Sequence, residues 1–196
     1  QIGRLMDTVR EIFTLDEDAE ITMEMNPGTV TEEKLRKYRQ AGVNRLSIGL
    51  QSVNDEELRL LGRIHTYEEF REAYHLARAN GFSNINVDLI SAIPGQTVES
   101  WRRTLEQVMA LSPEHISAYS LILEEGTTFY KKYVEDEAKE GPKLPDEDAE
   151  RQMYWDTETL MEKNGYHRYE ISNYAKEGYA CRHNPVSYTH LRAHET

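Results

Sequence analysis

Apolar residues recur along the chain with two different spacings. In residues 2–15 they recur every three or four positions, which is typical of an amphipathic helix. Strand-like segments are predicted at residues 20–26, 44–51, 83–90 and 115–122, and helices at residues 32–40, 54–61, 66–80 and 97–111. Repeated strand and helix at intervals of a few tens of residues predicts βαβ units and a parallel sheet.

The pattern changes after residue 125. Residues 126–144 are charged and poorly periodic, a helix is predicted from Pro145 to Gly165, and residues 166–172 form a candidate final strand. We therefore expect an α/β fold: a partial (β/α) TIM-like barrel over residues 1–125, followed by a linker and the start of a small C-terminal α+β domain over residues 126–184.

The predicted strands have one apolar and one polar face. Leu46, Ile48 and Leu50 alternate with polar or small residues that end in Gln51, and the segments ending near Asn26 and Asp88 follow the same pattern. A closed eight-stranded barrel fills its interior with apolar side chains, so a polar inner face indicates an incomplete or wider barrel that holds a polar ligand. An antiparallel sheet with one hydrated face is the alternative.

Composition limits the classes of partner. The formal net charge is -12, and no cluster of Lys and Arg is free of acids, so nucleic acid is not an expected partner. There is no apolar run of membrane-spanning length and no signal-peptide pattern, so we expect a cytoplasmic location, and the sequence does not indicate membrane contact. The one cysteine, Cys181, cannot form an internal disulfide.

The last twelve residues have a different character. Residues 185–196 read PVSYTHLRAHET, which resembles the translation of an adapter used in short-read sequencing. We therefore expect residues 185–196 to be a non-native tail that, like an expression scar, is not part of the native fold. A genuine polar C-terminus is the alternative, and on the adapter interpretation the native sequence is interrupted after Asn184.

Several motifs occur in a specific order. Residues 24–29 read EMNPGT, 41–52 AGVNRLSIGLQS, 61–65 LGRIH, 86–90 NVDLI and 93–97 IPGQT. Their order and spacing resemble those of the radical S-adenosylmethionine (SAM) family that contains oxygen-independent coproporphyrinogen oxidases and related heme chaperones. The resemblance extends over essentially residues 1–184.

The resemblance implies a SAM site. Its expected residues are Glu24, Gln51, Arg63 and Asp88, which offer hydrogen bonds or an ion pair, and Ile122, which packs against adenine. Each has a structural alternative. Glu24 and Asp88 could cap neighbouring turns, Gln51 could hold loop backbone, and Arg63 could pair with Glu56 or Glu57.

The resemblance also implies a [4Fe–4S] cluster, held in that family by a CxxxCxxC loop that this sequence does not contain. The family's Gly-rich loop is likewise missing. We therefore expect the chain by itself to lack radical chemistry, and to be poorly stable because missing strands would leave open sheet edges.

Two later segments resemble the heme-chaperone branch, residues 169–175 (YEISNYA) and 181–184 (CRHN). This implies a parent that binds heme and delivers it to a heme-accepting protein, with His183 as a candidate heme ligand or, alternatively, a loop histidine. His65 and His115 are expected to be structural, and His75 to lie on the surface. Coproporphyrinogen III oxidase is the alternative within the family, and a non-radical barrel that binds a metabolite is the alternative outside it.

Overall fold

The computed structural model describes residues 1–136 and 141–186, so residues 187–196 of the predicted non-native tail lie outside it. One sheet of six strands organises the chain, in the order β1-β2-β3-β4-β6-β5. The strands are β1 (Thr22–Met25), β2 (Arg45–Gln51), β3 (Ile85–Ser91), β4 (His115–Ser120), β5 (His167–Glu170) and β6 (Asn173–Ala175). Strands β1 to β4 are parallel, which confirms the predicted βαβ arrangement and makes the antiparallel alternative wrong for them.

Helices connect the strands close to the predicted positions. They are α1 (Ile2–Ile12), α2 (Glu32–Ala41), α3 (Asp55–Leu60), α4 (Tyr67–Ala79), α5 (Val98–Ala110) and α7 (Glu147–Lys163). Thr31, Asn54, Thr66 and Thr97 accept hydrogen bonds from backbone N–H groups in the first helical turns, as their sequence positions predict. Shorter turns are η1 (Pro27–Thr29), α6 (Thr128–Tyr130), the π-helical η2 (Lys131–Glu135) and α8 (His183–Val186).

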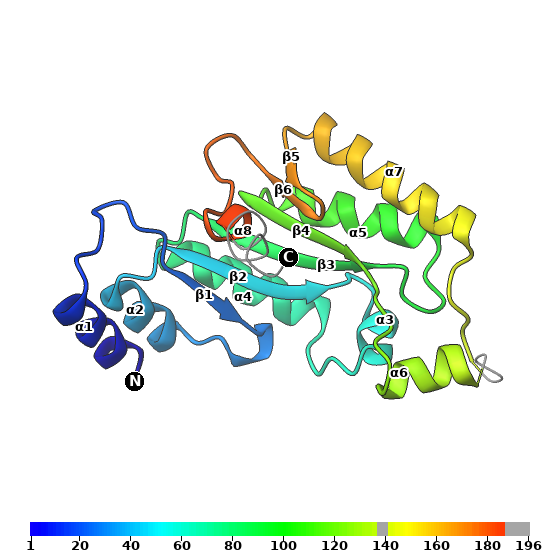
Figure 1. The fold of residues 1–196 in the computed structure, drawn as a ribbon, viewed down its shortest axis with the longest axis horizontal. Helices are drawn as coiled ribbons and strands as arrows, with labels where there is room; N and C mark the ends of the chain where they lie inside the picture. Colours follow the sequence, from blue (N-terminus) through cyan, green and yellow to red (C-terminus); the bar gives the residue numbers. More distant parts are fainter. Residues whose placement is uncertain (137–140, 187–196) are drawn as a thin grey trace, which may run out of the picture.

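The hydrophobic core lies between the sheet and its helices. Figure 1 shows α4 and α5 running behind the strands, with α7 beside α5. The apolar strand residues Ile48, Val87 and Ile116 pack with Phe70 of α4 and Trp101 of α5 in one buried cluster. The polar face of each strand is thereby directed away from the core, as the alternation predicts.

Helix α7 is attached to α5 by polar contacts as well as apolar ones. The indole Nε1 of Trp101 donates to Thr157 Oγ1 at 2.8 Å and to the Met153 carbonyl at 3.2 Å. Arg102 and Asp156 form an ion pair at 2.5 Å between Nε and Oδ2. These contacts hold the chain after residue 145 against the barrel-like part. The predicted domain boundary at residue 125 stays a prediction.

The sequence interpretation missed strand β6. It has three residues, and it pairs antiparallel with both β4 and β5. Its side chains are buried although the segment is too short to show a periodic pattern. The antiparallel β5–β6 hairpin therefore ends a sheet that is otherwise parallel.

The opposite edge of the sheet is β1. Nearby, the apolar residues Leu5, Ile12 and Phe13 of α1 and the turn after it are more than half exposed. The predicted poor stability of the isolated chain stays a prediction.

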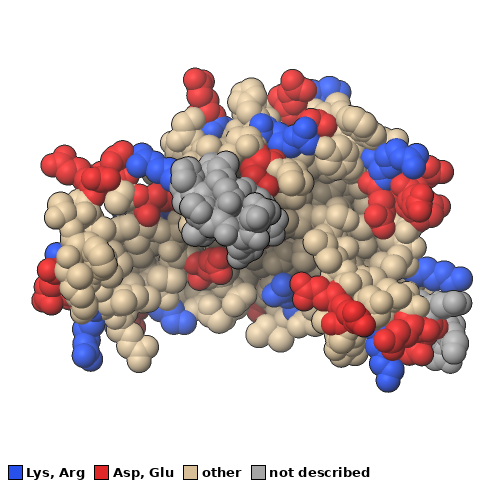
Figure 2. Space-filling model, viewed as in Figure 1, with Lys and Arg blue, Asp and Glu red and all other residues tan. Residues whose placement is uncertain are grey.

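Figure 2 shows Lys and Arg side chains interspersed with Asp and Glu over the viewed face. Within the described residues, no helix has the length and apolar content needed to cross a bilayer.

Trp101 offers a direct test of the α5–α7 contact. We expect Trp101→Phe to lower the free energy of unfolding by about 2–3 kcal/mol, because it removes buried ring area and a buried donor. Urea unfolding followed by circular dichroism measures this difference. The matched control is Trp155→Phe, since Trp155 is 55% exposed on α7. Equal effects of the two substitutions would contradict this account of the packing.

Candidate functional site

The polar faces of β1 to β4 line one large pocket. Its volume is about 1110 Å³, and it also receives residues from the loops after the strands and from the segment 181–184. The pocket residues predicted from the sequence are Glu24, Gln51, Asp88, Ile122 and His183. Motifs that lie far apart in the sequence therefore meet in one pocket, although the role of each residue stays a prediction.

Glu24, Gln51 and Ile122 lie toward the carboxyl ends of their strands. Glu24 is exposed, and no described residue hydrogen-bonds with its carboxylate, so it does not cap the following turn. Gln51 is buried at the end of β2 with a φ of 77°, a conformation that non-glycine residues rarely adopt. A Cβ atom at Gly49 would approach Gln51 Nε2 to 3.0 Å, so the missing side chain at position 49 leaves room for the glutamine amide.

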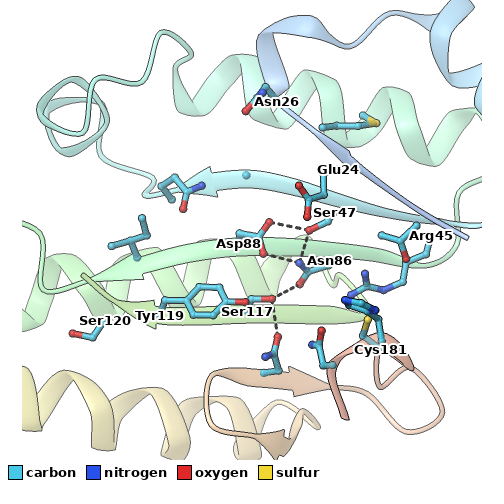
Figure 3. Close-up of a pocket in the computed structure, with 18 of the residues that line it drawn as sticks. Glu24, Asn26, Arg45, Ser47, Asn86, Asp88, Ser117, Tyr119, Ser120 and Cys181 are labelled. Carbon is cyan, nitrogen blue, oxygen red and sulfur yellow. Dashed lines mark hydrogen bonds between the residues drawn. The ribbon is translucent and has the colours of Figure 1, made fainter. Parts of the chain in front are cut away.

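Asp88 lies deeper in the pocket, on β3. Ser47 Oγ donates to Asp88 Oδ2 at 2.9 Å, and Asn86 Nδ2 donates to Asp88 Oδ1 at 2.8 Å. Figure 3 shows these three side chains facing one another across two strands. Burial raises the pKa of Asp88, and the two hydrogen bonds oppose that shift. The carboxylate therefore belongs to the strand network and does not cap residues 91–93.

A chain of hydrogen bonds leads away from Asp88 through Asn86. The Asn86 Oδ1 atom lies 2.6 Å from His115 Nδ1, and His115 Nε2 lies 2.6 Å from the Tyr169 hydroxyl. Because an amide oxygen can only accept, His115 carries its proton on Nδ1 and accepts at Nε2 from the tyrosine. The phenol in turn accepts from the Cys181 backbone N–H and from Asn184 Nδ2.

The protonation states of this chain follow from its burial. Burial, with a smaller contribution from Arg45, lowers the pKa of His115 to about 3. Burial also raises the pKa of Tyr169 to about 12. At neutral pH the imidazole is therefore neutral and the phenol is protonated, as the donor directions require. The prediction that His115 is structural agrees with this environment.

Arg45 is a pocket residue that the sequence analysis missed. It is 4% exposed at the start of β2, it forms no ion pair with a described residue, and its Nε has no hydrogen-bond partner among them. Its position has the same parity as Ser47, Gly49 and Gln51, so strand alternation alone could have placed it on the pocket side. Figure 3 shows Arg45 and Cys181 at one end of the pocket, far along the strands from Ser120.

The segment 181–184 lies at this Arg45 end. The Cys181 thiol is buried and donates to Glu20 Oε1 at 3.2 Å, and burial raises its pKa. His183 is exposed and lines the pocket beside Asn184. The heme-chaperone-like segment therefore lies at the Arg45 end of the pocket, whereas Glu24 and Asp88 lie between that end and Ser120 (Figure 3).

Arg63 is the predicted residue that does not line this pocket. Its Nε is buried without a partner among the described residues, and it forms no ion pair with Glu56 or Glu57. Its predicted contact with a ligand carboxylate stays a prediction. His65 is buried with Nε2 3.2 Å from the Leu50 carbonyl, and His75 is exposed, as expected for both.

The described residues do not fit an iron–sulfur cluster. Within residues 1–136 and 141–186, no group of three or more His, Cys, Asp or Glu side chains is placed to hold a metal ion. A [4Fe–4S] cluster takes several thiolates, whereas the lone Cys181 is committed to Glu20. The polar pocket itself, with its unpaired carboxylate, amide and guanidinium groups, fits a zwitterionic ligand such as SAM.

The neutral state of His115 predicts acid sensitivity. Its folded-state pKa, about 3, lies below the ordinary histidine pKa of 6.5, so its stabilising contribution is complete above pH 6.5 and is lost as pH falls toward 3. We expect the difference in free energy of unfolding between wild type and His115→Gln to shrink by up to ~1.4 kcal/mol per pH unit. Urea unfolding at pH 7.5, 6 and 5 measures it. His75→Gln is the exposed control, and parallel pH profiles for His115→Gln and wild type would refute the assignment.

Comparisons with known proteins identify the family. A sequence model of the radical SAM superfamily matches residues 2–108. The heme chaperone HemW of Escherichia coli is 43% identical over 180 residues, which cover 92% of this chain and 46% of that protein. HemW of Haemophilus influenzae is 40% identical over 183 residues, or 93% of this chain and 46% of that protein. The chain thus spans about half the length of these curated relatives.

A solved structure agrees with the fold. Coproporphyrinogen III oxidase (HemN) from Escherichia coli, described as a radical SAM enzyme, superposes with a TM-score of 0.77 at 30% identity, covering 90% of this chain and 40% of that one. The sequence match, the partial parallel barrel and this structural likeness lead to one assignment: the chain belongs to the radical SAM superfamily.

Proposed function

We propose that this chain is part of a heme chaperone that binds SAM and a [4Fe–4S] cluster and delivers heme to an acceptor protein. The observation that supports SAM binding is the meeting of Glu24, Gln51, Asp88 and Ile122 in one polar pocket. The choice of heme chaperone rests on the likeness to the HemW proteins.

The pocket residues would divide the recognition of SAM between them. Glu24 has a free carboxylate that can accept from ribose hydroxyls or from the amino group. Gln51 offers a donor and an acceptor from one buried side chain. Ile122 is 80% exposed after β4, so an adenine ring packed on it would cover apolar surface.

Asp88 is available to bind SAM, whereas the described residues contribute no ligands to the cluster. The Asp88 carboxylate is oriented by Ser47 and Asn86, which leaves it with further lone pairs for a ligand. The cluster, when present, supplies the electron that reduces a bound sulfonium. The described residues provide no ligand set for it, so no step is assigned to this chain through the cluster.

Heme is the proposed cargo, and His183 is its proposed ligand. An imidazole nitrogen is a common axial ligand of heme iron. His183 is exposed and lines the pocket, so a ligand that occupies the pocket would lie beside its imidazole.

A second candidate function is the oxidative decarboxylation performed by coproporphyrinogen III oxidase. The likeness to the HemN structure favours it. The two candidates share the SAM site and differ in what the porphyrin undergoes, because a chaperone returns heme unchanged whereas the oxidase releases carbon dioxide.

Glu24 provides the test of SAM binding. In the complete gene product, prepared anaerobically with iron and sulfide, we expect Glu24→Gln to raise the SAM dissociation constant roughly tenfold, the cost of a lost charge-assisted hydrogen bond. Isothermal titration calorimetry measures it. Glu72→Gln is the control, since Glu72 is exposed on α4 outside the pocket. Unchanged affinity in Glu24→Gln would remove Glu24 from the site.

His183 provides the test of the cargo. We expect the same preparation to bind heme, with a Soret band that weakens or shifts in His183→Ala but not in the exposed control His75→Ala. Incubation with SAM, a reductant and coproporphyrinogen III should release no carbon dioxide. Carbon dioxide release would replace the chaperone by the oxidase, and identical spectra for both variants would exclude His183 as the ligand.

A further inference from the structure

A buried carboxylate lies beneath the strand ends, outside the pocket. Glu57, on α3, is 6% exposed and accepts three hydrogen bonds. Its Oε2 accepts from Ser52 Oγ at 2.6 Å and from Gln96 Nε2 at 2.9 Å, and its Oε1 accepts from Ser100 Oγ at 2.5 Å. Among the described residues no cation pairs with it, so these neutral donors alone compensate for the burial of the group.

The three donors come from three different segments. Ser52 directly follows Gln51 at the end of β2, Gln96 belongs to the loop after β3, and Ser100 lies in the first turn of α5. The Gln96 Oε1 atom also accepts from the Ile93 backbone N–H at 3.4 Å. One carboxylate therefore joins the loops after two neighbouring strands to the helix that follows the second of them.

Strained backbone occurs beside both contacts, at the last residue of β2 and in the loop after β3. Gln51 has a φ of 77° and Ala92 a φ of 59°, the left-handed region that residues with a side chain seldom occupy. Ser52 is the neighbour of Gln51, and Ile93 is the neighbour of Ala92. Such conformations persist only where surrounding contacts hold them, and the contacts of Glu57 and Gln96 reach the adjacent residue in each case.

We propose that Glu57 is a positioning residue that fixes Gln51, and the loop after β3, in the geometry required for binding at the strand ends. The inference rests on the proposed SAM site. Glu57 does not touch the ligand and acts through Ser52 and Gln96. Of the three residues that donate to Glu57, Ser52 is adjacent in sequence to the pocket residue Gln51. Ser100 lies in α5 and is not adjacent to a pocket residue.

Two matched hydroxyl deletions test the inference. Ser52→Ala and Ser100→Ala each remove one buried hydroxyl from the same carboxylate. Ser52 Oγ also accepts from the Asn54 backbone N–H at 3.0 Å, so a purely structural role predicts a larger loss of stability for Ser52→Ala but similar SAM affinities for the two folded variants. We expect Ser52→Ala to raise the SAM dissociation constant roughly tenfold, and Ser100→Ala to raise it less than about twofold. Calorimetry on the complete gene product, at a temperature where each variant is folded, measures both constants.

Substitutions of Glu57 itself extend the test. Glu57→Met removes both acceptors and should weaken SAM binding at least as much as Ser52→Ala. Glu57→Gln should restore most of the affinity, because its amide oxygen still accepts from Ser52 and Gln96 while its NH2 group donates to the rotated Ser100 hydroxyl. Glu56→Met is the control, since the neighbouring Glu56 is exposed on the same helix.

The outcomes separate the two proposals. Wild-type protein that does not bind SAM refutes the proposed function. Wild-type protein that binds SAM, with equal affinities for Ser52→Ala and Ser100→Ala, overturns the role of Glu57 and leaves the SAM site standing. If Glu57→Met does not fold, the pair of serine variants decides the question.

Discussion

The pocket side of the sheet depends on the full hydrogen-bonding of one buried amide. Asn86, 2% exposed, donates from Nδ2 to Ser47 and Asp88 and accepts at Oδ1 from His115. Its Oδ1 also shares the one proton of the Ser117 hydroxyl, 3.2 Å away, with Asn173 Oδ1, which lies 2.9 Å from that hydroxyl. These four contacts use the donors and acceptors that a side-chain amide has. They connect β2, β3 and β4 on the face opposite the apolar core, where side-chain packing by helices is not available to hold the strands in register.

The same bonds set the character of the site. Burying polar groups lowers the stability of a fold unless the groups are hydrogen-bonded to one another. A network with some groups left unpaired is less stable than an apolar core. Ser117 extends the network to Asn173 of β6, and Tyr169 extends it to the segment 181–184. The antiparallel hairpin is thus attached to the parallel strands through side chains as well as backbone, and its polar residues complete the lining of the pocket.

Much of this architecture could be predicted from alternation and caps. The apolar parity of Leu46, Ile48 and Leu50 placed Gln51 on the pocket side, and Thr66 marked the start of α4. The network itself could not be read in the same way, because His115 and Tyr169 are 54 positions apart and meet only once β5 and β6 have joined the sheet. Arg45 was missed because its strand was interpreted from its apolar residues. Arg63 was grouped with the pocket because of the order of the motifs, and this order does not indicate which way a side chain points.

The direction of the hydrogen bonds through Asn86 has a further consequence. From Tyr169 to His115 each group donates to the next, and both hydroxyl and imidazole can pass on a proton in such a series. An amide cannot do so at ordinary cost, because its oxygen accepts while its separate nitrogen donates. Asn86 therefore interrupts proton transfer: the hydrogen bonds from the segment 181–184 to Asp88 can transmit a change of position, while a proton can reach or leave the aspartate only from the open side of the pocket.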